Sequence, residues 1–300
     1  MKPKILLNPG TGWAGTTPFY YTLRDAKFCN AGYKKEFHYL KMMYLNQKDF
    51  TNWMIYRYTA DEYTEHRSGK SIKITAEYDK DHYQALLEPE HSFDKYIYHM
   101  HYMKDMFPEY EAVCDFSNWN IILPEEFLTA HADAIKPHFD VKVTMLIADP
   151  VFRYYQELGG VINYYHREKK GNFNTKPIKN EDMIYVHYVR TKQQQKLFKY
   201  CVERSRFSKN CYYEDNIEKF RRSYGNKNVL VLEMEKLWNV SYHNETFDRL
   251  SEFLDYEISP DHLYPNKYMS ENKNIEGLKD QDTELEPLTD ELYEFGKRYL

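Results

Sequence analysis

The stretch from Lys2 to Thr17 constrains the fold more than any other part of this 300-residue chain. Ile5–Leu7 is a short apolar run, which predicts a buried strand, and the Asn-Pro-Gly directly after it ends that strand. A loop with three glycines follows, and glycine lets bare backbone approach a ligand. Thr16 then begins a predicted helix that runs through Phe28. A strand, a glycine loop and a helix N-terminus together predict an anion site, because free N–H groups and the helix dipole favour negative charge there.

The spacing of the loop narrows the choice of anion. Gly10 and Gly15 are separated by four residues and two threonines follow, so the loop has the pattern G-x-x-x-x-G-T-T. A nucleoside-triphosphate loop needs lysine where Thr16 stands, because that ammonium reaches the β- and γ-phosphates. The absence of this lysine argues against ATP or GTP hydrolysis and favours a smaller anion, such as one 5′-phosphate. The alternative is a glycine-rich turn that only connects the first strand to the first helix.

This stretch resembles the 5′-phosphosulfate loop of the sulfotransferases that use PAPS (3′-phosphoadenosine 5′-phosphosulfate), of the carbohydrate and heparan type. That family typically carries K-x-G-T-T after its first strand. The G-T-T is present at residues 15–17, whereas Trp13 stands at the family's lysine position. The resemblance implies that the 5′-phosphate is held by Gly12, Trp13, Ala14, Gly15, Thr16 and Thr17.

A second pattern lies in residues 32–40, where aromatic and polar residues alternate and predict a strand. On a strand, Glu36 and His38 share one face and Lys35 points to the other. A carboxylate and an imidazole that point the same way near a phosphate loop suit proton abstraction. The pattern K-E-x-H-[FY] is also similar to the K-E-x-H-F segment of heparan-type sulfotransferases, which implies Glu36 as general base, His38 as its partner and Lys35 as a charge near the transferred group. The alternative is an ordinary edge strand with surface charges.

Residues 141–148 form the clearest buried strand, because their nearly continuous apolar character is typical of a central parallel strand. The D-P-x-x-R that follows resembles the 3′-phosphate element of the family, R-[DN]-P-x-x-R-x-x-S. Its aspartate, its proline and Arg153 match, while Ala148 and Gln156 stand where the family has arginine and serine. The resemblance implies that Arg153 and Gln156 meet the 3′-phosphate. The alternative is an ordinary helix start with aspartate as N-cap and proline in the first turn.

The remaining pattern predicts the fold class. Strands are expected at residues 111–115 and 228–235, and helices with apolar spacing alternate with them, as from Phe93 to Phe107. This alternation predicts one α/β domain over residues 1–300, a three-layer parallel sheet flanked by helices, for which the resemblance implies the P-loop-like sulfotransferase fold. Residues 51–90 and 168–190 are candidate insertions. Ligands of such a sheet bind at the carboxyl ends of its strands.

Composition excludes several classes of partner. The formal net charge is −5, so no global positive field attracts nucleic acid. The four cysteines have no metal-binding spacing, which favours reduced thiols and no metal site. No signal peptide precedes the first strand, and no apolar run approaches the roughly 18 residues of a membrane span, so we expect a soluble, cytoplasmic protein.

These patterns together predict an enzyme that transfers a sulfuryl group from PAPS to a hydroxyl of an unidentified acceptor, with a sugar as one candidate. Two alternatives remain open at this point. One is a catalytically lapsed sulfotransferase fold that binds a nucleotide or a glycan, which the residues at Trp13, Ala148 and Gln156 favour. The other is a kinase-like protein, which shares the strand–loop–helix opening but lacks the loop lysine and a clear acidic pair for Mg²⁺.

Overall fold

The computed structural model describes residues 2–12, 14–32, 35–46, 51–52, 62–64, 71–73, 80–88, 90–153, 195, 199, 212–264, 294 and 297. Trp13, Gln156, Cys201, Cys211 and the candidate insertion at 168–190 therefore lie outside the described residues. The prediction of a single domain over residues 1–300 stays a prediction.

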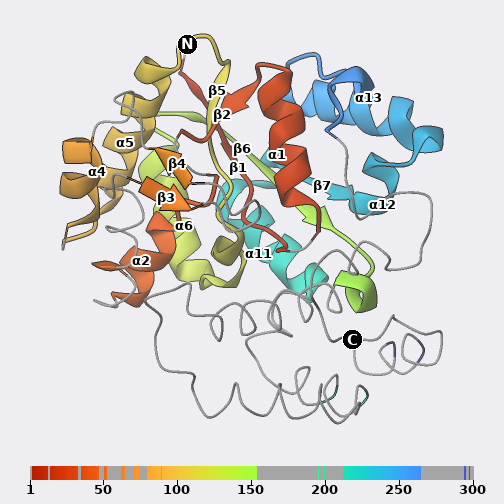
Figure 1. Ribbon diagram of the computed structural model, residues 1–300. Helices are drawn as coiled ribbons and strands as arrows, with labels where there is room; N and C mark the ends of the chain where they lie inside the picture. The colour runs from red at the N-terminus through yellow and green to blue at the C-terminus, as the bar shows by residue number, and fades with distance from the viewer. Residues whose placement is uncertain are drawn as a thin grey trace.

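A five-stranded parallel sheet forms the centre of the described molecule (Figure 1), as the alternation of strands and helices predicts. Its strand order is β2-β5-β1-β6-β7, with β1 in the middle. Leu7, the last residue of β1, pairs with Asp115 on β5 and with Val143 on β6. The strands are β1 (Lys4–Leu7), β2 (Cys29–Asn30), β5 (Ala112–Asp115), β6 (Asp140–Ile147) and β7 (Val229–Glu233).

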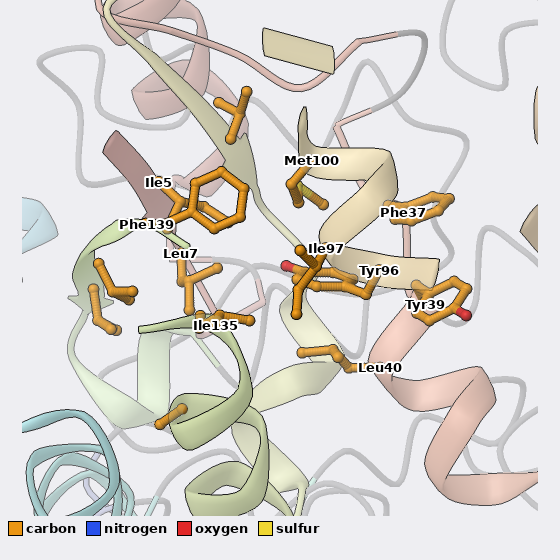
Figure 2. Close-up of a cluster of buried hydrophobic side chains, with 14 of the residues drawn as sticks. Ile5, Leu7, Phe37, Tyr39, Leu40, Tyr96, Ile97, Met100, Ile135 and Phe139 are labelled. Atoms are coloured by element: carbon orange, nitrogen blue, oxygen red, sulfur yellow. The ribbon is translucent and has the colours of Figure 1, made fainter. Parts of the chain in front are cut away.

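Two hydrophobic clusters cover the two faces of this sheet, because successive side chains of a strand point to opposite sides. Ile5 and Leu7 of β1 belong to one cluster, which Figure 2 shows with the helix residues packed on it. Leu6 belongs to the other cluster. The predicted three-layer α/β architecture is thereby confirmed.

The helices divide between the two faces (Figure 1). The face with Ile5 is covered by α2 (Tyr39–Leu45), α4 (Lys80–Leu87), α5 (Phe93–Met106), α6 (Glu125–Ile135) and α11 (Tyr213–Tyr224). The face with Leu6 is covered by α1 (Thr16–Asp25), α12 (Met234–Leu237) and α13 (His243–Leu254).

Shorter elements complete the described chain. Single turns of 3-10 helix are η1 (Asn118–Ile122), η2 (Asn226–Asn228), η3 (Val240–Tyr242) and η4 (Pro260–His262). Two short strands, β3 (Glu62–Thr64) and β4 (Ser71–Lys73), form an antiparallel pair inside the candidate insertion at 51–90.

The predicted strand over residues 32–40 is wrong. Strand β2 ends at Asn30, the described residues 35–38 have no strand pairing, and α2 begins at Tyr39. The alternating aromatic residues nevertheless point inward, because Phe37 and Tyr39 are buried against α5 (Figure 2). The alternation therefore reflects two buried aromatic side chains that hold this loop against α5, and not a strand that pairs in a sheet.

Candidate functional site

The glycine loop and the start of α1 lie at the carboxyl end of β1, as the sequence predicts. Gly15 has a φ of 75° and is the N-cap residue of α1, so no side chain caps this helix. A Cβ at this position would lie 2.9 Å from the ring of Trp238, which leaves room only for glycine. The first turn is Thr-Thr-Pro and has no acidic residue of its own. The amides of Thr16 and Thr17 lie outside the helical ladder, as the first amides of a helix do, and point toward the positive end of the dipole.

Two buried polar side chains hold the loop in place from below. The Thr11 amide and its hydroxyl both donate to the carbonyl oxygen of Leu146 at the end of β6, at 3.1 and 2.8 Å. Arg153 is fully buried, and its Nη1 donates to the carbonyl oxygen of Gly12 at 2.9 Å. The arginine that is predicted to meet the 3′-phosphate therefore braces the glycine loop in this structure.

Arg153 reaches the loop because a helix starts directly after β6. The Phe152 amide donates to the Asp149 carboxylate at 2.8 Å, which is the N-cap bond that the D-P-x-x-R pattern predicts as an alternative. Ala148 is buried and has no side-chain donor for a phosphate.

The segment 35–38 brings Lys35, Glu36 and His38 to the N-terminus of α1. Lys35 Nζ lies 2.8 Å from Glu36 Oε1 and 3.4 Å from the hydroxyl of Thr16. His38 Nε2 lies 3.3 Å from the other oxygen, Glu36 Oε2. The side chain of Glu36 as a whole is 29% exposed. The three predicted catalytic residues thus meet in one cluster, although they do not lie on a strand.

Electrostatics keep Glu36 ionised. Burial acts to raise the pKa of its carboxyl group, but the charge of Lys35 and the hydrogen bond and charge of His38 outweigh burial. The net pKa lies well below its usual range. Glu36 is consequently a carboxylate across the physiological pH range.

A buried carboxylate fixes the backbone beneath this cluster. The hydroxyl of Ser117 donates to Asp115 and accepts a hydrogen bond from the His38 amide at 2.8 Å. Tyr96 donates to the second oxygen of Asp115 at 3.1 Å. Burial raises the pKa of Asp115, and hydrogen bonds from Ser117, Tyr96 and Asn120 together with the charge of His38 oppose that rise in part. His38 has a φ of 56°, and this network holds that unusual backbone conformation.

Asn118 is the site residue that sequence analysis missed. Its Nδ2 donates to Glu36 Oε1 at 2.7 Å, and its Oδ1 accepts from the hydroxyl of Thr16 at 3.2 Å. Its backbone also contacts the glycine loop, because a Cβ on Gly10 would lie 2.9 Å from the Asn118 carbonyl oxygen. The available signal was its place directly after β5, because ligands of a parallel sheet bind at the carboxyl ends of its strands.

The structure thus brings most of the predicted residues together. The described part of the loop (Gly12, Ala14, Gly15, Thr16 and Thr17) lies at the carboxyl end of the sheet with Lys35, Glu36 and His38. Within the loop, Ala14 is buried and Thr17 is half-buried.

Three further observations concern metal binding, membrane helices and cysteines. Within the described ranges, no group of three or more histidine, cysteine, aspartate or glutamate side chains is placed to hold a metal ion. Among the described helices, none combines the length and the apolar character that crossing a bilayer requires. Cys29 and Cys114 are buried free thiols.

No family model matches this sequence. No curated protein sequence matches it either. Among solved structures, the chain is similar to a sulfotransferase from Alicyclobacillus acidocaldarius at 14% identity and a TM-score of 0.45, over 100% of this chain and 94% of that one. It is also similar to a sulfotransferase domain from the curacin biosynthetic pathway at 13% identity and a TM-score of 0.44, over 99% of this chain and 97% of that one. Both neighbours are described as sulfotransferases. The fold and the site rest on the strand order and the contacts given above.

Proposed function

We propose that this protein is a sulfotransferase that moves a sulfuryl group from PAPS to the hydroxyl of an acceptor, with a sugar as one candidate. The observation that carries the proposal is the cluster at the start of α1, where a carboxylate, a lysine and a histidine surround an uncapped helix N-terminus. Lys35 contacts both the carboxylate and the helix N-terminus, because its Nζ lies 2.8 Å from Glu36 Oε1 and 3.4 Å from the Thr16 hydroxyl. Few chemistries need a base and an anion site this close together, and group transfer to a hydroxyl from a phosphate-linked donor is one of them.

The residues divide the reaction between them. The amides of Thr16 and Thr17, with the Thr16 hydroxyl, bind the 5′-phosphate of the donor. Glu36 takes the proton of the acceptor hydroxyl while the oxygen of that hydroxyl forms a bond to sulfur. His38 holds the carboxylate of Glu36 in place. The bond between sulfur and the 5′-phosphate oxygen breaks, and its electron pair stays on the leaving adenosine 3′,5′-bisphosphate. Lys35 and the helix dipole stabilise the charge that develops on that phosphate.

The 5′ side of the donor fits the described residues better than the 3′ side does. Arg153 is committed to the Gly12 carbonyl and is fully buried. We therefore propose that Arg153 serves the donor by fixing the loop, and that a direct contact with the 3′-phosphate requires it to leave that carbonyl. Gln156 stays a candidate for the 3′-phosphate from the sequence pattern alone.

The test is the variant Glu36→Gln. It keeps the shape of the side chain but removes the proton acceptor, so transfer of labelled sulfuryl from PAPS to a panel of sugars and small alcohols should fall by about 10²-fold or more. Calorimetry should show adenosine 3′,5′-bisphosphate bound as tightly as by the unmodified protein. The matched control is Glu245→Gln on the exposed surface of α13, which should leave both measurements unchanged.

Arg153 and Ala148 favour one second candidate, a sulfotransferase fold that binds the nucleotide without turnover. An unmodified protein that binds the bisphosphate in preference to ATP, but transfers to no acceptor in the panel, would select this candidate.

Turnover of Glu36→Gln at the rate of the unmodified protein would remove Glu36 from the reaction.

A further inference from the structure

Four hydrogen bonds close a ring between the phosphate loop and the proposed base. Lys35 Nζ donates to the Thr16 hydroxyl at 3.4 Å, and that hydroxyl donates to Asn118 Oδ1 at 3.2 Å. Asn118 Nδ2 donates to Glu36 Oε1 at 2.7 Å, and Lys35 donates to the same oxygen at 2.8 Å. The members come from α1, from the segment 35–38 and from η1, so the ring joins three separate parts of the chain.

The chemistry of the partners fixes the direction of every bond in this ring. A carboxylate only accepts hydrogen bonds, so the NH₂ group of Asn118 must face Glu36. Its carbonyl oxygen then faces Thr16, which must donate its single hydroxyl proton to Asn118. Lysine only donates, and it meets the lone pairs of that hydroxyl. Asn118 is therefore oriented from both sides, and the state of the Thr16 hydroxyl affects the hold on Glu36.

We propose that Asn118 is the positioning residue of this site, which couples Thr16 in the phosphate loop to the carboxylate of Glu36. This assignment deepens the proposed function and rests on it where it treats Glu36 as the catalytic base. The coupling between Thr16 and Glu36 is itself a property of the folded chain. An anion that binds at the start of α1 needs the one proton that Thr16 gives to Asn118. Donor binding and the placement of the base are consequently linked through this side chain.

Besides Asn118, one other described residue, Lys35, links Glu36 to Thr16. Among the described residues, Lys35 and His38 of the same segment form ion pairs with Glu36. The element η1 contributes the neutral Asn118, and Asp115 of β5 acts on His38 through Ser117. Lys35 is the only one of these groups bonded to both Thr16 and Glu36 among the described residues, and it is kept in every variant below.

The first experiment measures the pKa of Glu36 by NMR of ¹³C-labelled glutamate, assigned with Glu36→Gln. Removing a hydrogen-bond donor from a carboxylate raises its pKa, so Asn118→Ala should raise that of Glu36 by about one unit. Thr16→Val should cause a smaller rise, because Asn118 keeps its donor but loses its orientation. The double variant should equal Asn118→Ala alone, since both changes act on one path. Additive shifts, or no shift in Asn118→Ala, would overturn the coupling.

The second experiment separates positioning from a structural role. Asn118→Ala should lower kcat by about 10- to 100-fold with little change in acceptor KM, and should move the acid limb of the pH–rate profile upward with the pKa of Glu36. It should bind adenosine 3′,5′-bisphosphate as tightly as the unmodified protein or more tightly, because Thr16 no longer gives its proton to Asn118. Weaker binding together with an unmoved pH profile would show a structural role and overturn the proposal.

Two controls keep the outcomes distinct. Asn239→Ala removes an exposed side-chain-to-backbone hydrogen bond to the Ser241 amide, which no member of the ring shares, and should change none of these values. Asn118→Leu keeps about the same size and removes the donor without adding a charge, so it should repeat the rise in the pKa of Glu36 if Asn118→Ala folds poorly. If the unmodified protein transfers no sulfuryl group, the proposed function fails, while the pKa measurements still decide the coupling.

Discussion

The N-termini of α1 and α5 show two opposite ways of treating the start of a helix. Helix α5 completes its own first turn, because the Ser92 hydroxyl accepts from the Lys95 amide at 3.2 Å and Asp94 faces the positive end of the dipole. Helix α1 begins at a glycine, has no side-chain cap and has no acidic residue in its first turn. Both ends are packed into the described fold, so the difference is not one of exposure alone.

This difference separates stability from function. A capped and charged N-terminus satisfies its free amides without help, which stabilises the helix by about 1 kcal/mol for the cap alone. The start of α1 lacks that stabilisation, although Lys35, Glu36 and Asn118 gather around it. Amides left without a capping side chain, next to a cation and a carboxylate, are what an anionic donor and a proton acceptor require.

The largest effect is expected from Gly15→Val, which attacks the α1 end itself. The new side chain must adopt a φ near 75° and meets Trp238 at 2.9 Å, so the free energy of unfolding should fall by roughly 2–4 kcal/mol. Bisphosphate binding should be lost, as measured by calorimetry. Gly225→Ala is the matched control, because it has a φ of 99° but its Cβ would meet only Asn228 Nδ2, at 3.5 Å. It should lower stability less and leave binding intact.

A smaller and sharper effect is expected when α1 is made to resemble α5. Thr17→Asp places a carboxylate in the first turn, which should raise the free energy of unfolding by about 0.3–1 kcal/mol at low salt. The same charge should weaken bisphosphate binding about tenfold or more, because the carboxylate interacts with the positive end of the helix dipole in place of the phosphate and repels the phosphate. Asp94→Asn in α5 should do the reverse to stability without any change in binding. Unchanged affinity in Thr17→Asp would show that the anion binds elsewhere.

The smallest effect is expected from Ser92→Ala at α5. Loss of the cap should lower the free energy of unfolding by about 1 kcal/mol in a denaturant titration. The Tyr39 hydroxyl still bonds to the backbone of residue 92, through the amide at 3.1 Å and the carbonyl at 3.2 Å, so the helix should keep its place. Bisphosphate affinity should not change. A loss of affinity in this variant would mean that the two helix ends are coupled through Tyr39 and would end the contrast between them.

The site could be predicted only where its signal is local in the sequence. The Gly10–Thr17 pattern predicts a strand, a loop and a helix, because glycine and threonine act on the backbone beside them. The neighbours Lys35, Glu36 and His38 were found as a motif, but the strand proposed to orient them is absent, since Phe37 and Tyr39 are buried against α5 instead of pairing in the sheet. The motif prediction was right that these three side chains meet, and wrong that a strand brings them together.

The sequence by itself determined the parallel α/β fold class and the alternation of strands and helices. It also determined the glycine at the start of α1 and the chemical types of the residues at 35–38. These depend on apolar runs, on backbone freedom and on side-chain type, all of which act over a few residues. Only the tertiary structure decided that Arg153 faces the Gly12 carbonyl and that Asn118 joins Thr16 to Glu36. Such contacts link residues 82 to 141 positions apart, and their partners are set by which strands and turns lie side by side in the sheet.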